Sequence, residues 1–205
     1  MTEKNYTGLV PENKEGKEIT ATASETLNST EAAKELYNKA KERLQSVNNW
    51  GKIAGKLSAN FQVTDDKGNE VNRNAAKGDH FRIDIPAPAS KAGGGYDWAR
   101  VEDVKEVNKG DIDSVAIRVR PAENPTNDNK NIAHFLSEKS TSTFTVTREG
   151  KEVTACIYDR NIEANEESNE PIDKLRNSVV GLGAKHAFSK LQWQALANAL
   201  IEKTG

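Results

Sequence analysis

Hydrophobic and polar positions alternate along the chain with two different periods. From Ser29 onward, apolar residues recur at steps of three and four, and charged residues occupy the other faces. This spacing predicts an amphipathic helix over about residues 30–48. Ser29 or Thr30 is placed to cap its start, and the pair Asn48 and Asn49 is typical of a helix end.

The middle of the chain, about residues 57–158, consists of short apolar runs with period two. Turn sequences such as "DDKGNE", "AAKGDH", "VNKGDID" and "REGK" separate the runs. Short strands joined by tight turns favour antiparallel hairpins. One connection, residues 120–143, is too long for a hairpin, and connections of that length are usually functional or mobile. We therefore expect a curved antiparallel sheet, and its closure into a partial barrel stays open.

The C-terminal part returns to helical spacing and predicts helices over about residues 171–203. Pro171 suits a first helical position, and Ser189 to Gln192 form a capping box that predicts the start of a second helical segment. With the first helix, these elements predict an α+β fold. We expect a single domain over residues 25–205, in which terminal helices flank the sheet.

The first 24 residues show no apolar period and contain Gly8, Pro11 and Gly16 among mixed charges. They predict an extended or disordered arm. Such a segment buries too little apolar surface to offset its ordering entropy, so we expect it to contribute little to stability. Of the 205 residues, 35% are hydrophobic and the mean hydropathy is -0.77, which indicates a small core with many solvated positions.

Charge and segment composition exclude several classes of partner. The 29 basic and 31 acidic residues leave a net charge of -2, and neither sign forms a long block, so nothing favours nucleic acid or an anionic membrane. No stretch approaches the roughly 18 apolar residues that span a bilayer. A single cysteine, Cys156, fits a reducing compartment. These observations predict a soluble cytoplasmic protein without nucleic-acid or membrane partners.

Metal and cofactor motifs are not found in the sequence. The three histidines are far apart, and the acidic pairs near residues 65 and 111 lack the spacing of a calcium loop. The glycines of "GGGYDW" precede a predicted strand rather than a helix, unlike a dinucleotide-binding loop. We therefore expect no metal and no cofactor, and we expect Cys156, inside a strand, to be an inert buried thiol.

Two polar groups remain as candidates for binding. Beside the glycines, Tyr96 and Trp98 either form a mobile lid over a cleft or mark a bend in which Trp98 packs on the sheet, and we favour the bend. Elsewhere, arginines two apart on one strand and a polar run on another suit an anionic or sugar-like ligand if the strands are close, although a salt-bridged surface is the favoured interpretation. No catalytic residue is assigned, and the candidate binding residues are Tyr96, Asp97, Trp98, Arg118, Arg120, Tyr158, Asp159, Arg160 and Asn161.

Several motifs, in order, resemble a group of uncharacterised soluble proteins of the Bacteroidetes. These are "GDHFRIDIPAPAS", "GGGYDW", "IRVRPAENP", "STSTFTV" and "LQWQAL", in a chain that matches from about Trp50 onward. No activity is known for that group, so the resemblance implies no site. The order of helix, antiparallel strands and C-terminal helix is also loosely similar to the helix-grip ligand-binding fold of START-like proteins, whose closing helix is single.

Three functional hypotheses follow. The first is a non-enzymatic binding or assembly module, in which the N-terminal arm or the long connection meets a protein partner or a small polar ligand. The alternative is a small-molecule carrier or enzyme with a cavity between the sheet and the C-terminal helix, gated by the glycine stretch. A third is a structural subunit whose arm lies on another chain. Whether the chain forms homo-oligomers stays open.

Overall fold

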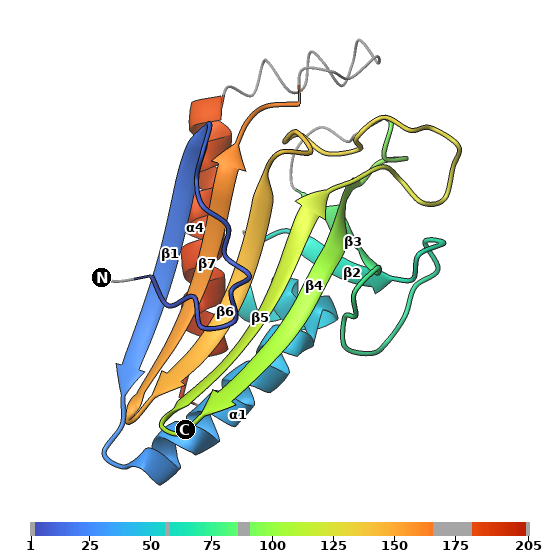
Figure 1. The fold of residues 1–205 in the computed structure, drawn as a ribbon. Coiled ribbons are helices and arrows are strands. Elements are labelled where there is room, and N and C mark those ends of the chain that lie inside the picture. The colour runs from blue at the N-terminus through green and yellow to red at the C-terminus, as the bar shows by residue number, and fades with distance from the viewer. Residues whose placement is uncertain (1–2, 56–57, 86–90, 166–181, 204–205) are drawn as a thin grey trace.

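A seven-stranded antiparallel sheet forms the centre of the fold (Figure 1). The computed structural model describes residues 3–55, 58–85, 91–165 and 182–203. The sheet is open, because β1 and β2 form its two edges in the order β1-β7-β6-β5-β4-β3-β2. The strands are β1 (Lys17–Thr26), β2 (Asn60–Thr64), β3 (His80–Asp84), β4 (Asp97–Lys109), β5 (Ile112–Pro121), β6 (Thr141–Glu149) and β7 (Glu152–Ile162).

Two long helices pack on one face of this sheet, which we call the helix face (Figure 1). The first, α1 (Thr30–Gln45), begins where the sequence predicted: the Ser29 hydroxyl accepts a hydrogen bond from the Ala32 N–H at 3.1 Å. It ends three residues before the expected boundary, and the 3₁₀ turn η1 (Val47–Asn49) and the short α2 (Trp50–Ala54) continue the chain.

The second long helix, α4 (Leu182–Leu200), corrects the expected start of a C-terminal segment. Ser189 lies inside this helix, where the backbone amides already bond to earlier carbonyls, so the prediction that Ser189 caps a new segment is wrong. The expected helix start at Pro171 lies outside the described residues. None of the described helices is both long and apolar enough to cross a bilayer.

The core lies between the helix face and the helices, and it centres on aromatic side chains. Trp50 is fully buried, and its ring centroid lies 4.5 Å from that of Phe144 and 5.4 Å from that of Phe61. Trp193 of α4 contacts Phe144 at 5.2 Å. The alternate residues of β5 and β7 complete this layer, as period two predicts: Val115, Ile117, Val119, Val153, Ala155 and Ile157.

The N-terminal arm is shorter than expected, because its last third belongs to the sheet. Residues 17–24 form most of β1 and pair antiparallel with β7, with Ile19 and Ala21 buried on the helix face. The expected domain boundary at residue 24 therefore falls inside a strand. Alanine and threonine supply most of the alternation in this segment, so its hydrophobic signal is weak. Residues 3–16, which we call the strap, cross the opposite, outer face of the sheet (Figure 1).

Candidate functional site

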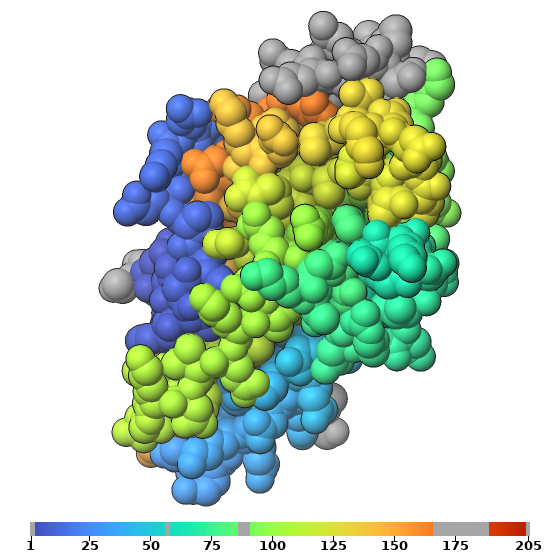
Figure 2. Space-filling model, turned by 45° about the vertical axis from the view of Figure 1, so that its right-hand side comes forward, coloured from blue at the N-terminus to red at the C-terminus, as the bar shows by residue number. Residues whose placement is uncertain are grey.

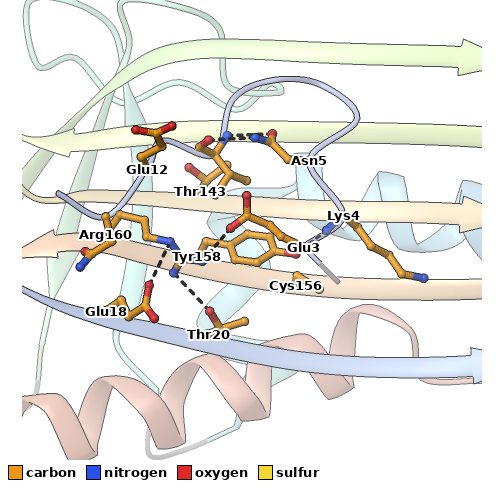
Figure 3. A network of polar contacts seen from close by, with 12 residues as sticks. Glu3, Lys4, Asn5, Glu12, Glu18, Thr20, Thr143, Cys156, Tyr158 and Arg160 are labelled. Atoms are coloured by element: carbon orange, nitrogen blue, oxygen red, sulfur yellow. Dashed lines mark hydrogen bonds and ion pairs between the residues drawn. The ribbon is translucent and has the colours of Figure 1, made fainter. Parts of the chain in front are cut away.

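The strap lies on a row of side chains that the sheet register brings together on the outer face. Arg118 of β5 pairs with Thr143 of β6, which in turn pairs with Tyr158 of β7. The Leu9 carbonyl of the strap accepts hydrogen bonds from Arg118 Nη1 at 3.3 Å and from Thr143 Oγ1 at 3.4 Å. The Tyr158 hydroxyl accepts one from the Lys4 backbone N–H at 3.2 Å (Figure 3). Predicted site residues from β5 and β7 thus bind the chain's own N-terminal segment.

Arg160 is the most deeply buried cation of this network (Figure 3). Its guanidinium donates to the Ile19 carbonyl at 3.1 Å and to Thr20 Oγ1 at 3.2 Å. It also donates to Glu3 Oε2 at 2.9 Å, and its centre lies 5.1 Å from the Tyr158 ring centroid. An anion held by arginine forks was the less favoured interpretation of the sequence, and here the carboxylate of Glu3 holds that position.

Asn161 ends the regular part of β7 and fastens the strap. Its backbone has φ of 54°, a left-handed conformation that asparagine tolerates better than most residues. Its side-chain oxygen accepts from the backbone amides of Lys14 at 2.8 Å and Glu15 at 3.2 Å, and its side-chain nitrogen donates to the Glu12 carbonyl at 3.1 Å.

Asp159 points the other way, because successive residues of a strand face opposite sides of a sheet. Its carboxylate is buried on the helix face, where Oδ2 accepts a hydrogen bond from the Trp193 indole at 2.7 Å. Burial raises the pKa of Asp159 to about 6, against the opposing effects of nearby Ser142, the Trp193 indole and the charge of Arg160. Its other oxygen has no hydrogen-bond partner among the described residues. Asp159 is therefore separated from the outer network.

The two arginines of β5 share one carboxylate. Glu102 lies 2.7 Å from Arg118 Nε and 2.6 Å from Arg120 Nε, through its two oxygens. Arg120 also donates to the Glu138 carbonyl at 2.6 Å. Both guanidinium groups are therefore already paired with a carboxylate. This arrangement agrees with a salt-bridged surface, the favoured interpretation of the pair.

The glycine stretch forms a bend that wraps an indole. Gly94 and Gly95 have φ of 63° and 98°, and the Trp98 indole donates to the Gly93 carbonyl at 2.9 Å. Trp98 is 2% exposed, so it packs in the protein as the bend interpretation expects. Tyr96 lies over the guanidinium of Arg82 at 4.7 Å.

Asp97, the remaining candidate, is buried at the start of β4, where it accepts the Phe135 N–H at 3.2 Å. This bond ties the strand to the long connection between β5 and β6. The candidates Tyr96, Asp97 and Trp98 thus form a group apart from the strap network.

A pocket of about 660 Å³ lies beyond the end of β7. One of its walls is the long connection, which is held to the strand end by bonds from the Ser137 amide to the Glu163 carbonyl and from the Asn165 amide to the Phe135 carbonyl, both at 3.0 Å. Figure 2 shows these two segments, in yellow and orange, side by side at the upper end. The described lining residues are Gly16, Lys17, Lys130, Asn131, Ile132, Ser137, Glu138, Lys139, Ile162, Glu163, Ala164 and Asn165.

Cationic groups from three segments meet around this pocket. Lys139 lies 3.3 Å from Glu163, and Lys130 lies 3.3 Å from Glu123, whereas Lys17 has no ion pair within the described part of the chain. The Ser137 hydroxyl oxygen is buried and has no hydrogen-bond partner among the described residues. Sequence reasoning missed these residues, because single lysines in separate segments carry no motif. Only the length of the connection signalled the region.

The alternative hypothesis predicted a cavity between the sheet and α4. In the described region, large side chains occupy this space. Phe144 and Trp193 are in edge-to-face contact there, and Phe61 lies 6.3 Å from Trp193. The pocket of about 660 Å³ lies instead at the end of the sheet.

With a C-terminal helix packed on an antiparallel sheet, the chain has an α+β fold similar to the helix-grip arrangement. No family model and no curated protein sequence matches it. Among solved structures, it is similar to hypothetical protein jhp0584 from Helicobacter pylori, at 15% identity and a TM-score of 0.47 over 96% of this chain and 93% of that one. It is also similar to truncated norcoclaurine synthase from Thalictrum flavum, at 10% identity and a TM-score of 0.38 over 93% of this chain and 99% of that one. For Ara h 8.0201, the identity is 10% and the TM-score is 0.30, over 89% of this chain and 100% of that one.

Proposed function

We propose that the protein is a small-molecule-binding protein that holds a small organic anion in the pocket at the end of β7. The observation that carries this proposal is the pocket itself. Its volume of about 660 Å³ falls within the roughly 300–1,000 Å³ of small-molecule sites. The pocket also lies where the long connection, expected to be functional, meets the sheet.

The lining residues define the chemistry of the ligand. Among the described lining residues, three lysines against two glutamates leave one formal positive charge. Lys17 is the lysine without an ion pair in the described region, and it supplies a cation for a carboxylate or similar group. The buried hydroxyl of Ser137 supplies a hydrogen-bond donor. The side chains of Ile132 and Ile162 provide apolar contact for the rest of the molecule.

The other hypothesis, docking of a partner through the N-terminal arm, has less support. Glu3, Lys4 and Leu9 already contact the chain's own sheet, so a partner would have to displace them. Binding in the pocket requires no such exchange.

Isothermal titration calorimetry with hexanoate and hexanol tests the proposal. The two probes have equal chain length, so a preference for hexanoate reports the cationic group. We expect saturable binding of hexanoate, and we expect Lys17→Gln to weaken it several-fold. Lys203→Gln, which removes a lysine paired with Glu25, serves as the matched control and should leave affinity unchanged. Absence of saturable hexanoate binding, or equal affinity in Lys17→Gln, would reject the proposal.

A further inference from the structure

A second cavity, of about 310 Å³, lies at the opposite end of β6, on the helix face beneath α1. Its residues come from α1 and from the two hairpins that join β4 to β5 and β6 to β7. None of the candidates from the sequence analysis lines it. The lining residues are Lys34, Tyr37, Asn38, Glu106, Asn108, Gly110, Asp113 and Arg148.

A buried ion pair gives this cavity a fixed base. Arg148 is 1% exposed, and its Nε lies 2.6 Å from Asp113 Oδ2. Arg148 Nη1 also donates to the Gly150 carbonyl at 3.0 Å. A charge buried this deeply is costly unless it is paired, so the pair is held in one geometry and positions the neighbouring groups.

Tyr37 of α1 is 4% exposed, and its hydroxyl has no hydrogen-bond partner within the described part of the chain. Glu106 and Asp113 belong to the same cavity lining as Tyr37. Burial, followed by these two carboxylates, raises the pKa of Tyr37, so the phenol remains a neutral group that both donates and accepts. A buried hydroxyl without a partner destabilises the fold, and a ligand that supplies the partner removes that cost.

Two amide side chains on the rim are also without partners. Asn38 and Asn108 make no side-chain hydrogen bond to any described residue, and each offers both donors and an acceptor. The four charged lining residues cancel, since Lys34 and Arg148 oppose Glu106 and Asp113. The lining itself therefore carries no net formal charge, and its Glu106 is already ion-paired with Lys41.

From these groups we infer that the cavity beneath α1 binds a neutral polyhydroxylated molecule of about monosaccharide size. Hydroxyl groups donate and accept at the same atom, which matches the phenol and the two amides. The volume lies at the lower end of the range for small-molecule sites, which suits a single sugar ring or a cyclic polyol. The site is separate from the pocket at the end of β7, so it does not depend on the proposed function.

Side-chain amide resonances in ¹⁵N-correlated NMR spectra of the full chain test this inference. The probes are D-glucose, myo-inositol and glycerol, each titrated separately, with hexanoate as the anionic comparison. We expect saturable shifts of the Asn38 and Asn108 side-chain amides with glucose or inositol, and none with hexanoate. We expect Tyr37→Phe to weaken that binding about tenfold, equivalent to about 1.4 kcal/mol, without lowering the stability of the free protein.

The control variant is Tyr96→Phe, which removes a hydroxyl far along the sheet and should leave affinity unchanged. If Tyr37→Phe does not fold, Asn108→Ala on the exposed rim replaces it, with the same expected weakening. A cavity that holds only water gives no saturable shift with any of the three polyols. That result, or unchanged polyol affinity in the variant, would overturn the inference.

Discussion

The two faces of the central sheet are held in different ways. On the helix face, the Phe144 ring packs against both Trp50 and Trp193, with centroid distances of 4.5 and 5.2 Å. On the outer face, the strap is attached mainly through hydrogen bonds and ion pairs to Arg160, Tyr158 and their neighbours (Figure 3). The same strands therefore carry an apolar core on one side and a polar attachment on the other. This difference predicts that stability resides mostly on the helix face.

The two cavities described above lie near opposite ends of the sheet. The larger one adjoins the end of β7, and the smaller one lies beneath α1 beside Arg148. Aromatic side chains fill the space between them on the helix face. Five experiments, ordered by expected effect, test the comparison between the faces.

The largest effect should come from Trp50→Ala on the helix face. Removing this fully buried ring leaves a cavity among three other aromatic rings, and we expect a loss of about 3–5 kcal/mol in the free energy of unfolding. Urea denaturation measures it. Leu191→Ala, in the exposed part of α4, should cost far less. Equal losses would contradict the assignment of the core.

Asp159→Asn tests the buried carboxylate on the same face. A pKa raised from 3.8 to about 6 means that the fold prefers the protonated acid. Stability from this group is full below pH 3.8 and is lost as the pH rises through 6. One pKa unit corresponds to about 1.4 kcal/mol, so the wild type should lose about 3 kcal/mol relative to the variant between pH 3, below the unfolded pKa, and pH 8.

Urea titrations at a series of pH values measure the Asp159 effect. Asp128→Asn, on the exposed long connection, reports the background change from removing a carboxylate. A difference between wild type and Asp159→Asn that is constant with pH would show that the carboxylate is not perturbed by burial.

Deletion of residues 1–15 removes the strap and keeps β1. The strap residues Leu9 and Val10 are buried in the intact protein. We therefore expect the deletion to lower the free energy of unfolding by about 2 kcal/mol, the order of one buried apolar side chain. This revises the expectation that the arm contributes little. Cys156, which is 3% exposed in the intact protein, should react at least tenfold faster with a thiol reagent. Lys14→Ala, which keeps the backbone bond to Asn161, is the control.

Gly94→Ala tests the bend around Trp98. Its φ of 63° strains any residue with a Cβ, and we expect a cost of about 1 kcal/mol. Gly94→Asn should cost less, since asparagine tolerates left-handed backbone. If Gly94→Ala left the denaturation midpoint unchanged but abolished hexanoate binding, the stretch would be a hinge instead.

Two serines distinguish a true helix start from an apparent one. Ser29→Ala removes the bond to Ala32 and should cost about 1 kcal/mol. Ser189→Ala, inside α4, should cost nothing measurable, because alanine is the better residue in a helix interior. Hydrogen exchange of α1 and α4 measures both. A comparable loss at Ser189 would restore the helix boundary that the sequence predicted.

Local patterns predicted the helix face well and the outer face poorly. Alternation of large apolar residues identifies the strands, and a capping serine identifies α1. β1 was not predicted as a strand, because alanine and threonine carry little hydrophobic signal. The attachment of the strap was not predicted, because its partners, such as Arg160 and Tyr158, lie about 150 residues away in the chain. Residues of both cavities meet only through the sheet register and the fold of the long connection, which no short motif encodes.

The most direct test of the proposed function is backbone ¹⁵N-correlated NMR of the full chain during titration with hexanoate. If the pocket at the end of β7 binds organic anions, saturable shifts should concentrate in residues 130–139 and 162–165 and at Lys17. Shifts should be small in residues 34–38 and 106–113 around the second cavity. Saturable shifts centred on the space between the sheet and α4, or no shifts in either pocket segment, would contradict the proposal.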